Sequence, residues 1–111
     1  DELVGQLVHA SRGGLEVVAL ARTAVSDAGV AVLARGCPRL RALDLTWCMS
    51  FTDEGALALA ADAHNLRELR ADWTRLSDSG LTALLRDCPL IDRIFCSSTR
   101  VHSPRTARVL R

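Results

Sequence analysis

The chain repeats one short pattern of apolar and polar residues about every 25 positions. In its middle, Leu40, Leu43 and Leu45 alternate with polar or small residues, as in a short strand. Thr52 and Asp53 follow, a pair that can cap a helix N-terminus. Apolar residues then recur at the three- and four-residue spacing of one helix face. This stretch therefore predicts a strand, a turn and a helix.

The same unit occurs on both sides of this stretch. Its first position is apolar at intervals of 25, 26 and 25 residues, at Leu15, Leu40, Leu66 and Ile91. A Ser/Thr-Asp-x-Gly helix start also recurs, at residues 26–29, 52–55 and 77–80. Self-similarity at a period of about 20–50 residues is typical of a solenoid, in which each repeat packs against its neighbours.

The repeats predict one continuous solenoid domain in five segments. They are residues 1–14, the helix of an incomplete repeat; 15–39, 40–65 and 66–90, three full repeats; and 91–111, an atypical capping repeat. The last segment has His102-Ser103-Pro104-Arg105 in place of the usual helix start and is rich in arginine, as a terminal repeat with a polar outer face is expected to be. We expect the chain to begin inside an earlier repeat of a longer protein and to end at or near a true C-terminus.

The full pattern resembles the cysteine-containing subtype of leucine-rich repeats. It reads L-x-x-L-x-L-x-x-C/T, then S/T-D-x-G, an Ala/Leu helix and C-P-x-L, and it is clearest at residues 37–55 and 88–91. The subtype is similar to the repeats of F-box/leucine-rich-repeat proteins, in which an F-box recruits a ubiquitin ligase and the repeats hold the substrate. Thr replaces Cys at positions 23, 74 and 99, His64-Asn65 replaces Cys-Pro, and these residues contain no F-box.

The resemblance implies an α/β fold. It implies an open right-handed solenoid with a short parallel sheet on the concave face and helices on the convex face. Stacking would bury the apolar face that a single repeat cannot bury alone, because neighbouring parallel strands lie about 4.8 Å apart and share one core.

Charge and hydropathy argue against two classes of partner. The net charge is +1, with basic and acidic residues interspersed, so no overall field attracts nucleic acid or an anionic membrane. The longest apolar run, residues 56–61, is far shorter than the roughly 18 residues of a membrane span. We therefore expect protein partners, with no nucleic acid, membrane span or small-molecule substrate.

The cysteines and histidines are not spaced as a catalytic or metal site would require. The four cysteines form no CxxC pair and are expected to be buried thiols, which favours a reducing intracellular compartment: cytoplasm, nucleus or mitochondrial matrix. No secretory leader is visible. The three histidines are separated by two or more repeats, without a nucleophile at a matching position: His9, His64 and His102. An aspartate recurs at every helix start, which favours capping over metal binding: Asp27, Asp53 and Asp78. We expect no catalysis, cofactor or metal.

The strand positions that alternate with the core are expected to face outward from the sheet in register. They supply the candidate partner-binding residues, which are Trp47, Trp73, Arg70, Asp44, Asp72, Glu68, Arg93 and Phe95. Two interpretations stay open. Exposed Trp beside Arg is the composition of a binding hot spot. Alternatively, both Trp fold onto the turn after the strand and cover the core, and Arg70 neutralises Asp44 and Asp72.

Two functional hypotheses follow. The first is a non-catalytic protein-binding module, the substrate-recognition repeats of an F-box-like ubiquitin-ligase receptor. The second is a structural subunit of a large mitochondrial or cytoskeletal assembly, contacting its partners through the helices or through the basic end with Arg100, Arg105 and Arg108.

Overall fold

The computed structural model describes residues 2–101, in which four helices and four short strands form a regular stack. The elements are α1 (Glu2–Ser11), β1 (Val17–Ala19), α2 (Asp27–Gly36), β2 (Ala42–Asp44), α3 (Asp53–Asp62), β3 (Glu68–Arg70), α4 (Asp78–Asp87) and β4 (Arg93–Phe95). The predicted alternation of strand, turn and helix is confirmed. The helix expected after residue 102 lies outside the described residues.

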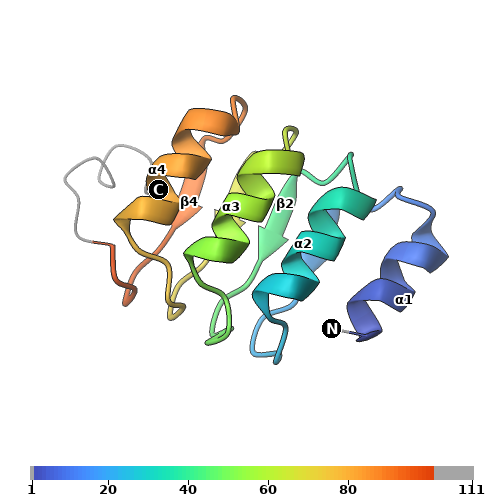
Figure 1. Ribbon diagram of the computed structural model, residues 1–111, viewed down its shortest axis with the longest axis horizontal. Helices are drawn as coiled ribbons and strands as arrows, with labels where there is room; N and C mark the ends of the chain where they lie inside the picture. Colours follow the sequence, from blue (N-terminus) through green and yellow to red (C-terminus); the bar gives the residue numbers. More distant parts are fainter. Residues whose placement is uncertain (1, 102–111) are drawn as a thin grey trace.

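The strands form one parallel sheet in the order β1-β2-β3-β4, and the helices lie side by side in a layer across it (Figure 1). In the predicted register, Leu43 pairs with Val18 on one side and Leu69 on the other, and Leu69 pairs with Ile94. These four strand centres are buried, as are Leu33, Leu59 and Leu84 on the inner faces of the helices. The sheet and helix layers therefore enclose one core that runs through every repeat.

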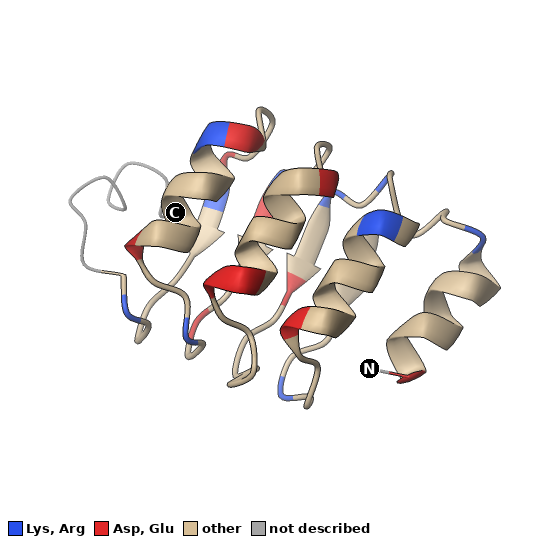
Figure 2. Cartoon of the chain, viewed as in Figure 1, with Lys and Arg blue, Asp and Glu red and all other residues tan. Residues whose placement is uncertain are grey.

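The aspartate at each helix start joins one repeat to the next. Asp27 accepts hydrogen bonds from the backbone N–H of Thr52, at 2.8 Å, and from its hydroxyl. Asp53 accepts the same two bonds from Ser77. The expectation that these two aspartates cap their own helices is wrong. The helix of Asp53 is capped instead by Thr52, whose hydroxyl accepts from the Glu54 N–H. In Figure 2 the acidic starts of α2, α3 and α4 follow one edge of the helix layer.

The glycine of the same motif leaves room for this contact between repeats. A Cβ atom on Gly55 would lie 2.5 Å from Asp27 Oδ1, and a Cβ on Gly80 would meet Asp53 Oδ1 in the same way. Both distances are far below van der Waals contact. The Ser/Thr-Asp-x-Gly motif is therefore an inter-repeat contact as well as a helix start.

All four cysteines are buried and free, as predicted from their positions in the repeat. The Cys48 thiol donates to the Leu20 carbonyl at 3.0 Å. Burial raises the pKa of Cys88 and of Cys96 to about 11, with a smaller contribution from nearby carboxylates. Burial also raises the pKa of Cys37.

These thiols are expected to make the protein lose stability at alkaline pH. The raised pKa values mean that the folded state keeps thiol protons that the unfolded state, with an ordinary pKa near 9.0, releases. Stability is therefore full below about pH 9 and falls as the pH rises through about 11, by on the order of 2 kcal/mol for each of Cys88 and Cys96. The sequence contains no Lys or Tyr, so cysteine is the only side-chain type with an ordinary pKa in this window.

Urea midpoints at pH 8 and pH 10.5 measure this loss. The Cys88→Val/Cys96→Val variant, whatever its stability at pH 8, is expected to show a much smaller drop between the two pH values. An equal drop in parent and variant would contradict the assignment to these thiols.

Candidate partner-binding surface

The sheet register brings the predicted site residues onto one surface. Glu68 pairs with Arg93, and Arg70 pairs with Asp44 on one side and Phe95 on the other. The central residue of each strand is buried and its two neighbours are exposed or half-buried. Outward-facing side chains from neighbouring strands therefore stand next to one another, away from the helices.

Trp47 and Trp73 stack at the end of this surface. Their ring centroids are 4.4 Å apart and their planes differ by 6°. Trp47 remains 40% exposed and Trp73 45% exposed. This geometry favours the first interpretation of the pair, because the rings cover each other and remain open to solvent.

A repeated turn creates this stack. Arg22, Trp47, Trp73 and Ser98 occupy the same position after successive strands, and all four have φ between 55° and 64°. The first three donate their backbone N–H to a carbonyl of the following repeat, at 2.8–3.0 Å. This left-handed conformation costs a non-glycine residue roughly 1–2 kcal/mol, and it points successive side chains the same way. We call these four residues the edge ladder.

Arg22 is a member of the ladder that the sequence analysis did not include among the site residues. Its guanidinium lies 5.8 Å from the centroid of the Trp47 ring, which is within the range of a cation–π contact. The shared turn position of Arg22 and Trp47 is the sequence signal that predicts this contact.

The charged residues pair differently from the expectation. Arg70 donates to Glu68 at 3.0 Å and stacks on Phe95, with its guanidinium carbon 5.0 Å from the ring centroid. Arg93 lies 3.7 Å from the other oxygen of Glu68. The interpretation in which Arg70 neutralises Asp44 and Asp72 is wrong, because within residues 2–101 neither aspartate forms an ion pair with it. Arg70 and Glu68 are two positions apart on one strand, so their side chains lie on the same face of the sheet and within reach of each other.

Both aspartates instead hold turns. Asp44 Oδ1 accepts from the Thr46 N–H at 3.0 Å and from the Thr46 hydroxyl at 2.7 Å. Asp72 Oδ1 accepts from the Ser97 N–H of the next repeat at 2.7 Å. Their negative charge is therefore held near the Trp pair without a cationic side-chain partner in the described part of the chain.

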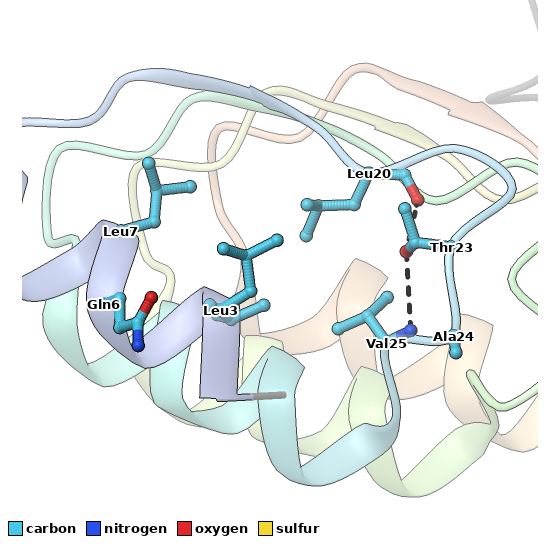
Figure 3. Close-up of a pocket in the computed structure, with 8 residues that line it drawn as sticks. Leu3, Gln6, Leu7, Leu20, Thr23, Ala24 and Val25 are labelled. Carbon is cyan, nitrogen blue, oxygen red and sulfur yellow. Dashed lines mark hydrogen bonds between the residues drawn. The ribbon is translucent and has the colours of Figure 1, made fainter.

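A hollow lies at the N-terminal end of the stack, between α1 and the turn after β1. It has a volume of about 480 Å³ and apolar walls that include Leu3, Leu7, Leu20 and Val25 (Figure 3). Among residues 2–101, α1 has no strand of its own, and Leu3 and Leu7 remain exposed although Val4 is buried in the core.

Two negative observations apply to residues 2–101. They hold no cluster of three or more His, Cys, Asp or Glu side chains with the geometry of a metal site. None of their helices, each of 10 residues, has the length and apolar character that a bilayer crossing requires. His102, Arg105 and Arg108 lie outside these residues.

Comparison with known proteins agrees with the repeat architecture. A family model described as Leucine Rich repeat matches residues 36–60. The putative F-box/LRR-repeat protein 9 of Arabidopsis thaliana is 34% identical over 70 residues, which are 61% of this chain and 28% of that protein. The chain thus spans under a third of this relative.

Two solved structures share the fold at low sequence identity. The tropomodulin C-terminal domain of Caenorhabditis elegans gives a TM-score of 0.63 at 19% identity, over 89% of this chain and 65% of that one. The Chaetomium Mex67:Mtr2 subunits give 0.58 at 21% identity, over 96% of this chain and 70% of that one. The described residues form an α/β stack with a four-stranded parallel sheet and a fold similar to that of leucine-rich-repeat proteins, and the repeats resemble those of F-box/LRR-repeat proteins.

Proposed function

We propose that this chain is a non-catalytic recognition module whose protein partner docks on the concave sheet at the edge ladder. The observation that carries the proposal is the exposed stack of Trp47 and Trp73. Leucine-rich repeats serve as protein-interaction modules, and Trp and Arg dominate the energetics of such interfaces.

The conformation of the two Trp supports a role on the surface. The repeated turn needs a left-handed residue, which Gly supplies without a steric cost. The core does not need the indoles either, because both rings project from it and remain about two-fifths exposed. A partner that covers them would bury a large apolar area, at about 25 cal/mol per Å².

We further propose that the partner is a substrate presented to a ubiquitin ligase. Support comes from the 34% identity with part of an F-box/LRR-repeat protein and from the cysteine-containing repeat pattern. The alternative is a structural subunit that contacts its assembly through its helices, and the same experiment tests it.

Capture of partners from cell extract tests the site. The Trp47→Ala/Trp73→Ala variant is expected to bind its partner at least about 30-fold more weakly, since truncating a hot-spot residue costs about 2 kcal/mol or more. Leu57→Ala is the matched control, because Leu57 is 52% exposed on α3 in the helix layer. Circular dichroism and urea unfolding must first show that both variants fold.

A partner retained by the folded double Trp variant but lost from Leu57→Ala would contradict the concave site and favour the structural subunit. Co-capture of ubiquitin-ligase subunits by the full-length protein is the outcome expected of a receptor. Their absence would contradict that finer proposal alone.

A further inference from the structure

We propose that the edge ladder has a vacant step at Ser98, which takes an arginine side chain from the partner protein. The inference rests on the proposed function and specifies its partner: a segment with an exposed arginine that stacks on the outer face of Trp73.

The geometry of the ladder defines the vacant step. Arg22 lies over Trp47, Trp47 lies on Trp73, and the next position in the column is Ser98. Ser98 has the same left-handed backbone, with φ of 55°, so its side chain continues the column. A serine side chain is far too short to cover an indole. Within residues 2–101, the face of Trp73 that is turned away from Trp47 therefore lacks a ladder neighbour of matching size.

The opposite end of the ladder shows which group fits such a face. There the chain places its own guanidinium, that of Arg22, 5.8 Å from the Trp47 centroid. A planar cation stacks on the negative face of an indole ring, and arginine does so more often than lysine. The partner's arginine would repeat at Trp73 the contact that Arg22 makes at Trp47.

Local charge favours a cation over a neutral ring. Asp72 precedes Trp73 and bonds the Ser97 N–H, so its carboxylate spans the gap between β3 and β4 beside the vacant step. On the two strands that flank this gap, Arg70 and Arg93 both pair with Glu68, and Arg70 also stacks on Phe95. Arg75 and Arg100 lie beyond the ladder, where their backbone N–H groups bond to Phe51 and Leu76.

The vacant step is tested with peptides of defined chemistry. Three matched Gly/Ser nonapeptides carry three Arg, three citrulline or three Phe residues, and binding is followed by Trp fluorescence and by the indole N–H resonances. The Arg peptide is expected to bind most tightly and to shift the Trp73 indole resonance more than that of Trp47. Tighter binding of the Phe peptide would overturn the assignment of a cation.

Ser98→Arg fills the step within the chain, as Arg22 does at the other end. It is expected to weaken the Arg peptide by about tenfold or more, the size of a desolvated cation–π contact. Leu57→Arg adds the same charge on the helix layer, away from the ladder, and is expected to bind as the parent does. Equal binding by Ser98→Arg and Leu57→Arg would overturn the proposal.

Partner capture separates this inference from the proposed function. A natural partner that is lost from Trp47→Ala/Trp73→Ala but kept by Ser98→Arg would support the concave site and overturn the vacant step. A partner lost from both variants and kept by Leu57→Arg supports both.

Discussion

Gly80→Ala is expected to lower the free energy of unfolding by about 3 kcal/mol, an amount that combines overpacking with the weakening of charge-assisted hydrogen bonds. The new Cβ would meet the Asp53 carboxylate and lie 3.0 Å from the Cβ of Ala56. Asp53 cannot move away and keep its bond to the Ser77 N–H, at 2.8 Å. Helix α4 must therefore shift away from α3 or lose that hydrogen bond.

The matched control is Gly5→Ala in α1. A Cβ on Gly5 meets nothing within 4 Å, and alanine is a better helix former than glycine by roughly 0.5–1 kcal/mol. Urea unfolding is thus expected to show a large loss for Gly80→Ala and none, or a small gain, for Gly5→Ala. Equal midpoints for the two variants would show that the carboxylate does not restrict this site.

Leu43→Ala is expected to cost about 2–5 kcal/mol, the range for truncating a buried leucine. Leu43 is 1% exposed at the centre of β2, where it pairs with Val18 and Leu69. The cavity would open in the middle of the stack, with little freedom for the flanking strands to collapse onto it. The same substitution at Leu57, which is 52% exposed, removes the same atoms with little loss of burial.

Urea or thermal unfolding compares the two leucine variants. The midpoint of Leu43→Ala is expected to fall well below that of Leu57→Ala. Coincident midpoints would mean that the inward and outward positions of the repeat are assigned wrongly.

The period of the sequence was sufficient to predict the strands, the helices and the sheet register. Every repeat must bury its apolar face, so only one alignment of the repeats is possible, the one that places Leu40, Leu66 and Ile91 in register. A shift by one residue would expose every strand centre. The same register predicted that Trp47 and Trp73 are neighbours, because equivalent positions in a parallel sheet lie one strand apart.

The pairing of the polar side chains was not predictable in the same way. Asp27 and Asp53 match a helix-cap pattern, yet both bond the cap residue of the following repeat. Arg70 has carboxylates on three sides, and its pairing with Glu68 depends on rotamers and on the Phe95 ring. Periodicity specifies the strand on which a residue lies and its neighbours in the register. The choice among several partners within reach depends on side-chain geometry, which a linear pattern does not contain.

The hydrogen bonds that Asp27 and Asp53 accept give the stack a direction, because each one comes from the repeat that follows the aspartate. Each of these carboxylates serves the repeat that follows it, so unravelling from the two ends has unequal consequences. Losing the later repeat leaves Asp53 as a carboxylate that water solvates readily. Losing the earlier one removes the acceptor of the Ser77 backbone N–H and hydroxyl, and Ser77 is the N-cap residue of α4, so the start of that helix loses the contact that holds it. The solenoid should therefore tolerate fraying from its C-terminal end better than erosion from its N-terminal end.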